Sequence, residues 1–185
     1  MKIFKIIFLS FIFLSSGVKA DLNQNLLKEL DQGGKLIFIR HAYAPGSGDP
    51  ENFNLDDCST QRNLSNSGKQ QSINIGKLFS KYEINIKKIY SSEWCRCKET
   101  ALIAFQKFET KKFLNSFYST QFSKNRKKQI REFKAFIKNW NKRSNLVFIT
   151  HYVFINELLN YAPSSGEIVF VDENLNILDT LVIEH

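Results

Sequence analysis

Two segments of this chain share a pattern of apolar positions: a β-branched and aromatic run that ends on a histidine. Residues 35–40 read Lys-Leu-Ile-Phe-Ile-Arg and lead into His41, and residues 145–150 read Asn-Leu-Val-Phe-Ile-Thr and lead into His151. Continuous apolar runs of this length are typical of parallel strands that are buried on both faces. The pattern therefore predicts two core strands whose C-terminal ends each present an imidazole.

The rest of the chain alternates between helical and strand-like apolar patterns. We expect helices over 22–30, 65–82, 93–108, 126–141 and 152–160, and further strands over 86–91, 112–117, 167–171 and 177–183. Strands that alternate with helices predict a three-layer α/β/α sandwich, with a mostly parallel central sheet, helices on both faces and an antiparallel C-terminal edge. Ile73 and Leu102 are expected to face the core. Residues 42–63 form a long loop rich in Pro, Gly and acids, which is typical of a functional lid.

The first twenty residues have the pattern of a secretory signal peptide. Lys2 and Lys5 precede an apolar run over 6–14, and the small residue Ala20 precedes Asp21. The pattern predicts a signal peptide over 1–20, cleaved before Asp21, and one domain over 21–185. An uncleaved N-terminal anchor is the alternative. Export would place the domain in the periplasm or outside the cell.

The net charge is positive but spread out. Removing the leader takes away three lysines and no acids, so the formal charge falls from +8 to +5. The remaining basic residues are not interleaved with aromatic residues in a nucleic-acid-binding motif, and an exported protein seldom meets nucleic acid. We therefore expect no nucleic-acid partner, and an anionic substrate or an anionic envelope surface instead. The oligomeric state does not follow from the sequence.

Three cysteines in an exported chain leave one thiol unpaired. Cys58 can pair with Cys95 or with Cys97, and the sequence leaves both pairings open. A zinc site is disfavoured because the spacing between Cys95 and Cys97 is too short for the usual knuckle and no second pair exists.

The strand ends carry the candidate chemistry. His41 and His151 would meet at the C-terminal edge of the sheet, where open α/β sheets bind ligands. Arg40 precedes His41, and Arg96 lies in the first turn of the helix that follows strand 86–91. Guanidinium groups at this edge indicate an anionic ligand. The alternative is a pair of ordinary histidines that are satisfied by loop hydrogen bonds.

Four motifs occur in an order that resembles the histidine phosphatase superfamily, which has the phosphoglycerate-mutase-like fold. They are Arg40-His41, the helix start LSxxGxxQS from Leu64, the segment SSxxxRxxxTA from Ser91, and the strand-end His151. Three longer sequence motifs resemble those of an exported bacterial subgroup of this superfamily, which is often labelled after lipopolysaccharide core heptose phosphate phosphatases. They are RHAxAPGxGDP, DCxTQRNLS and SSxWCRCxETA. The resemblance spans residues 35–171, nearly the whole domain.

The resemblance implies a metal-independent phosphatase without a cofactor, and the physical chemistry supports the same roles. A neutral imidazole at His41 can attack phosphorus and hold the phosphoryl group covalently. Arg40, Arg96 and, from the loop, Arg62 can bind the phosphoryl oxygens, and His151 can stabilise the transition state. We therefore expect an exported hydrolase of small-molecule or glycan phosphomonoesters. The alternative is a catalytically weak phosphate-binding or envelope-interaction protein on the same fold, and a mutase is a third reading.

The general acid of the superfamily has no counterpart at its usual places. Those places read Leu114-Asn115-Ser116 and His151-Tyr152, and neither contains an acid. Asp49 is the preferred substitute, and the other carboxyl groups that could serve are Glu51, Asp56, Asp57, Glu93 and Glu167.

Overall fold

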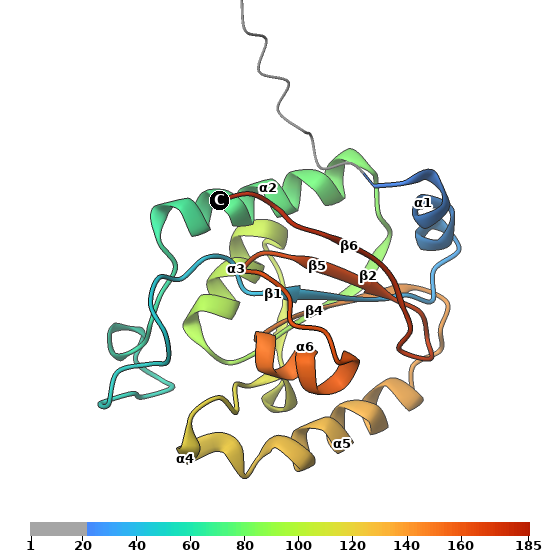
Figure 1. The fold of residues 1–185 in the computed structure, drawn as a ribbon. Coiled ribbons are helices and arrows are strands. Elements are labelled where there is room, and N and C mark those ends of the chain that lie inside the picture. The colour runs from blue at the N-terminus through green and yellow to red at the C-terminus, as the bar shows by residue number, and fades with distance from the viewer. Residues whose placement is uncertain (1–21) are drawn as a thin grey trace, which may run out of the picture.

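The structure is a computed structural model that describes residues 22–185 (Figure 1). The predicted signal peptide and its cleavage site lie outside the described residues. The helices are α1 (Gln24–Asp31), α2 (Asn66–Lys81), α3 (Cys95–Phe105), α4 (Thr120–Ser123), α5 (Arg126–Lys138) and α6 (Tyr152–Leu159), with short 3₁₀ turns η1 (Cys58–Thr60) and η2 (Lys112–Leu114). The strands are β1 (Leu36–Arg40), β2 (Ile86–Ser91), β3 (Glu109–Thr110), β4 (Asn145–Thr150), β5 (Ile168–Val171) and β6 (Ile177–Leu181).

Within these residues one six-stranded sheet has the order β3-β2-β4-β1-β5-β6. β1, β2, β3 and β4 run parallel to one another, whereas β5 pairs in antiparallel fashion with both β1 and β6. The two histidine-terminated strands are direct neighbours, and their register places Arg40 opposite Thr150. The predicted fold class, with its mostly parallel sheet and antiparallel edge, is confirmed.

Alternation along the central strands divides the core into two layers (Figure 1). Ile37 and Ile39 face the cluster that α1, α2 and α3 cover, whereas Leu36 and Phe38 face the cluster that α5 and α6 cover. Successive side chains of a strand point to opposite faces, so a strand between two helical layers must be apolar at every position. This is why β1 and β4 read as unbroken apolar runs.

Two local expectations were wrong. Residues 112–117 do not form a strand: the edge strand is β3, after which η2 turns the chain away and buries Leu114. Ile73 and Leu102 point outward, with 39% and 56% of their surface exposed. α2 and α3 approach closely at Gly76, where a Cβ would lie 2.5 Å from the backbone oxygen of Ala104, and Phe79 contacts Phe105 at a centroid distance of 5.0 Å. These contacts set which side of each helix faces the other, and Ile73 and Leu102 lie on the outer side.

Candidate active site

The two histidines meet at the C-terminal edge of the sheet, where the sequence predicts them. Their ring centroids lie 5.4 Å apart, and both side chains are buried. The backbone N–H of His41 donates to the carbonyl of Thr150 at 2.9 Å, which extends the β1–β4 ladder to the histidines themselves. The pairing of two parallel strands therefore sets the distance between the rings.

His41 is held with a defined side toward the crevice. Its Nδ1 lies 2.8 Å from the carbonyl oxygen of Ala42, and its Nε2 lies 3.2 Å from Nε of Arg96. A carbonyl oxygen can only accept and a guanidinium nitrogen can only donate, so the ring proton must be on Nδ1. The lone pair of Nε2 then faces the crevice, which is the arrangement that a nucleophilic imidazole requires.

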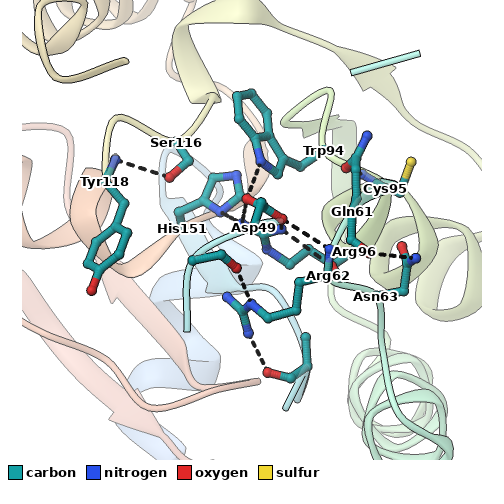
Figure 2. A network of polar contacts seen from close by, with 12 residues as sticks. Asp49, Gln61, Arg62, Asn63, Trp94, Cys95, Arg96, Ser116, Tyr118 and His151 are labelled. Carbon is teal, nitrogen blue, oxygen red and sulfur yellow. Dashed lines mark hydrogen bonds and ion pairs between the residues drawn. The ribbon is translucent and has the colours of Figure 1, made fainter. Parts of the chain in front are cut away.

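Arg96 is the hub of the site, and Asp49 is its main partner (Figure 2). The Asp49 carboxylate accepts a bidentate pair of hydrogen bonds from Arg96, from Nη1 at 2.7 Å and from Nη2 at 3.2 Å. Trp94 Nε1 and the backbone N–H of Arg62 donate to the same carboxylate at 3.0 and 3.1 Å. Asp49 thus lies where an oxyanion bound by Arg96 would lie.

Arg40 and Arg62 reach the same cavity with different degrees of freedom. Arg40 donates from Nη1 to the carbonyl of Pro163 at 2.9 Å, while its buried Nε has no partner among the described residues. Arg62 donates from Nε to the carbonyl of Gly48 at 2.8 Å and from Nη1 to that of Ala44. Arg62 therefore fastens the loop that carries Asp49, whereas Arg40 keeps an unused donor.

The loop between β1 and α2 is folded back on itself and joined to α3. Cys58 forms a disulfide with Cys95, and Gln61 accepts a hydrogen bond from the backbone N–H of Cys95 at 2.9 Å. Phe53 stacks on Trp94 at a centroid distance of 5.1 Å. Of the two pairings left open by the sequence, the structure contains Cys58–Cys95, and Cys97 is a buried free thiol. These contacts fix Asp49 and Arg62 relative to Arg96.

Burial controls the charge state of the site. Burial, followed by the nearby Arg96, holds the pKa of His41 and the pKa of His151 well below the ordinary histidine value. The pKa of Asp49 is also lowered: burial opposes this shift, but hydrogen bonds and charge from Arg96 outweigh it. Burial raises the pKa of the Cys97 thiol to about 12, so this cysteine is no thiolate nucleophile at neutral pH. The site thus combines two neutral imidazoles with a carboxylate.

All six residues predicted for the site line one cavity of about 320 Å³. They are Arg40, His41, Asp49, Arg62, Arg96 and His151. Among the substitute acids, only Asp49 and Glu51 line it. Glu93 instead accepts from Asn115, and Glu167 accepts from Tyr161 and from the backbone N–H of Ser164. An ion-paired carboxylate is a poor proton donor, so the pairing with Arg96 disfavours Asp49 as the acid, and that role stays a prediction.

Sequence reasoning did not single out several residues of this cavity. Four aromatic side chains form part of the cavity wall, namely those of Trp94, Tyr118, Phe122 and Tyr152. Trp94 lies inside the SSxxxRxxxTA segment, so that motif could have indicated it; the others carry no signal beyond their position in loops and a helix start.

In residues 22–185 no group of three or more His, Cys, Asp or Glu side chains is arranged to hold a metal ion. No helix in this part of the chain is long and apolar enough to cross a membrane.

Comparison with known proteins identifies the fold. No protein-family model and no curated protein sequence matches the chain. Among solved structures, the protein histidine phosphatase SixA complexed with tungstate is similar, with a TM-score of 0.59 and 13% identity over 80% of this chain and 96% of that chain. The SixA protein of Agrobacterium tumefaciens has a TM-score of 0.59 and 14% identity, covering 81% and 99% of the two chains.

A third similar structure is the product of an open reading frame from Mycobacterium tuberculosis. It has a TM-score of 0.60 and 14% identity, and the match covers 81% of this chain and 96% of that one. At such low identity the likeness establishes the arrangement of strands and helices rather than the reaction. The chain therefore has the phosphoglycerate-mutase-like fold of these SixA structures.

Proposed function

We propose that this chain is an exported phosphatase that works through a phosphohistidine on His41, with Arg40, Arg62, Arg96 and His151 around the phosphoryl group. The observation that carries the proposal is the tautomer of His41. Its Nδ1 is tied to the Ala42 carbonyl, and its Nε2 lone pair faces a cavity lined by three arginines. Binding of an anion alone needs no unprotonated nitrogen directed at it.

The reaction would proceed in two displacements. In the first, Nε2 of His41 forms a bond to phosphorus while the bond from phosphorus to the leaving oxygen or nitrogen breaks, and the leaving atom takes up a proton. In the second, water attacks the phosphohistidine, the P–N bond breaks, and its electron pair returns to Nε2 as phosphate leaves. The guanidinium groups balance the negative charge on the phosphoryl oxygens in both steps.

Binding of the substrate requires a change of partners at Arg96. Its Nε–H points to the Nε2 lone pair of His41, and two of its other N–H groups are engaged by Asp49. A phosphoryl group carries close to two negative charges and can compete with one carboxylate for the guanidinium. The buried Nε of Arg40 has no partner among the described residues, so this arginine keeps one unused donor for an anion that has entered the cavity.

The substrate class depends on the source of the proton for the leaving group. The walls formed by Tyr118, Phe122 and Tyr152 leave room for an organic group beside the phosphate. We propose a small-molecule or glycan phosphomonoester as the substrate, in line with the resemblance to the heptose phosphate phosphatase subgroup. Phosphoramidates such as phosphohistidine are the second class, since the neighbours named SixA are phosphohistidine phosphatases and such substrates need less help from an acid.

Export to the periplasm or outside the cell, independence of metal ions, and contact with an anionic envelope surface complete the proposal. The first is supported by the pattern of residues 1–20, the second by a site whose countercharge comes from arginines, and the third by the positive net charge.

The second candidate function is phosphate binding with little turnover. The specific observation in its favour is the Asp49 carboxylate, which already occupies the two-pronged donor face of Arg96. If that pair does not open for substrates, the protein retains the fold and an anion site but not the reaction.

One experiment separates the two functions. Purified residues 21–185 are assayed against a panel of phosphomonoesters and phosphoramidates with and without EDTA, and radiolabelled substrate is quenched rapidly to detect an acid-labile phosphoenzyme. We expect His41→Ala to lose both turnover and label. His185→Ala is the matched control, because His185 stacks on Tyr43 at 4.2 Å and does not line the cavity. Normal turnover in His41→Ala would exclude His41 as nucleophile, and loss of activity in EDTA would contradict metal independence.

A further inference from the structure

A series of hydrogen-bonded polar groups, formed by Ser92, Asn115 and Glu93, orients the His151 ring through its Nε2. Its Nε2 lies 3.0 Å from the hydroxyl of Ser92, and that hydroxyl lies 3.1 Å from Oδ1 of Asn115. Asn115 is in turn oriented by Glu93, whose backbone N–H donates to Oδ1 at 2.9 Å and whose carboxylate accepts from Nδ2 at 2.7 Å. Ser92 is fully buried. Asn115 and Glu93 are half-buried, so water cannot replace the Ser92 hydroxyl but can reach the outer end of this series.

The donor and the acceptor of each hydrogen bond in this series can be assigned, starting from the Glu93 end. The backbone N–H of Glu93 can only donate, so Oδ1 of Asn115 is an acceptor and Nδ2 is the donor to the carboxylate. Ser92 must then donate its hydroxyl hydrogen to Oδ1, and the backbone N–H of Trp94 also donates to the Ser92 oxygen at 3.3 Å. The remaining lone pair of Ser92 can only accept, so His151 must donate from Nε2.

The opposite ring nitrogen gives the same answer. Nδ1 of His151 lies 3.5 Å from Nη2 of Arg96, which can only donate. The nearest other group to Nε2 is the Cys97 thiol, at 3.5 Å, which is a weaker and longer contact than the Ser92 hydroxyl. Nδ1 is therefore the unprotonated nitrogen, and it faces the guanidinium that the phosphoryl group is expected to contact.

We infer that Ser92 and Asn115 are positioning residues that hold His151 in the tautomer protonated at Nε2, opposite to that of His41, so that both site histidines direct a lone pair at Arg96. This rests on the proposed function for its purpose, although the tautomers themselves do not depend on any reaction. A neutral His151 in this tautomer accepts at the crevice, and it donates to a phosphoryl oxygen only after Nδ1 takes up a proton. Ser92 and Asn115 thus define which nitrogen carries that exchangeable proton.

Nitrogen-15 NMR of the imidazole rings in the protein without substrate tests the assignment. The mature chain contains only three histidines, so the rings can be assigned with His→Gln variants. At neutral pH we expect His41 to be protonated at Nδ1 and His151 at Nε2. A wild-type His151 protonated at Nδ1, or one that exchanges equally between both tautomers, would overturn the inference whether or not the protein hydrolyses phosphate esters.

Two variants test whether the hydrogen bonds of Ser92 and Asn115 are responsible for the tautomer of His151. Ser92→Ala removes the acceptor of the Nε2 proton, and Asn115→Ala frees the Ser92 hydroxyl to turn toward His151 and donate to it. In both we expect the Nδ1-protonated tautomer to become populated, and kcat to fall by ~10-fold or more with little change in KM, the usual scale for hydrogen-bond partners that orient a functional histidine. Asn115→Ala also serves if Ser92→Ala does not fold.

Ser91→Ala is the matched control. Ser91 is an equally buried neighbour on β2 whose hydroxyl donates to the carbonyl of Ser92 and not to a histidine. We expect it to retain the wild-type tautomers and turnover. If His151 stays protonated at Nε2 in both Ser92→Ala and Asn115→Ala, Ser92 and Asn115 do not control its tautomer and the inference fails.

Discussion

The Arg96 guanidinium contacts both site histidines and Asp49. It donates toward the lone pairs of His41 and His151 and to both oxygens of Asp49, with only 3% of its side-chain surface exposed. Removing one partner from a buried charged network leaves the other charge uncompensated. Asp49 therefore balances the charge of Arg96, a role that differs from proton donation.

Asp49→Asn separates these roles. The amide keeps one acceptor oxygen, for either Trp94 Nε1 or the backbone N–H of Arg62, and it removes the charge that competes with phosphate. We expect tungstate or inorganic phosphate to bind ~10-fold more tightly, since losing one charge-assisted contact to a competitor is worth about 1.4 kcal/mol. Isothermal titration calorimetry measures this, and Glu51→Gln, which removes the other carboxylate lining the cavity, is the control. Weaker binding in Asp49→Asn would mean that Asp49 instead holds Arg96 in place.

The same variant tests Asp49 as the general acid in a separate assay. An acid matters for a poor leaving group and not for a good one, because only an alkoxide needs a proton as the P–O bond breaks. If Asp49 becomes the acid once substrate has displaced it from Arg96, Asp49→Asn should slow alkyl phosphates by roughly 10²-fold and barely change p-nitrophenyl phosphate. Equal effects on both substrates would exclude this role.

The lowered histidine pKa values predict how stability depends on pH. Because the pKa of each site histidine is lower in the folded than in the unfolded state, the unfolded chain binds more protons as the pH falls below about 6.5. The free energy of unfolding should then decrease toward acid, by at most about 1.4 kcal/mol per pH unit for each histidine. Carboxylates with lowered pKa values, such as Asp49, contribute stability that is lost only below about pH 4.

Urea unfolding between pH 7 and 4.5 measures this slope. His151→Gln should flatten it, whereas His185→Gln should leave it unchanged. A wild-type free energy of unfolding that is flat over this range would contradict the neutral, buried state of the site histidines.

At the scale of elements, the loop over residues 42–65 and the start of α3 act as one unit. The disulfide, the Gln61 contact and the stacking of Phe53 on Trp94 all join them beside the cavity. The loop has several attachments to α3, and its expected role as a lid stays a prediction. Opening of the Asp49–Arg96 pair is therefore a local event, since the rest of the loop is anchored on both sides of it.

Replacing Cys58 and Cys95 by serine together should weaken this unit. A disulfide with a sequence separation of 37 residues restricts the unfolded chain, and its loss typically costs about 2–4 kcal/mol. We expect a lower urea midpoint and weaker tungstate binding, because Asp49, Arg62 and Arg96 lose a covalent constraint. Unchanged midpoint and affinity would show that the non-covalent contacts alone hold the loop.

At the scale of the whole molecule, the prediction of export rests on residues 1–20. Material recovered from the periplasm of a secreting host should begin at Asp21, since Ala20 is the well-placed small residue after the apolar run. N-terminal sequencing or intact mass measures this. An intact Met1 on membrane-bound material would favour the anchor instead.

Much of the architecture can be predicted from the pattern alone. The unbroken apolar runs before His41 and His151 indicate strands buried on both faces, and helices between them imply parallel crossovers. Because parallel strands end at one edge, the convergence of Arg40, His41, Arg96 and His151 follows from their positions after strands or at a helix start. Periodicity fails for Ile73 and Leu102, because the contacts between α2 and α3 at Gly76 and at the Phe79–Phe105 pair decide which side of each helix is buried.

What only the tertiary structure decided is the set of partners within that edge. The sequence by itself determined the fold class, the histidine and arginine residues that meet, and a disulfide from Cys58 with two equivalent choices of partner. It did not determine that Cys95 rather than Cys97 is bonded, that Asp49 pairs with Arg96, or that Ser92 and Asn115 orient His151. Those contacts join residues 23 to 59 positions apart in the chain, so their geometry depends on loop conformation and side-chain direction, which local periodicity does not encode.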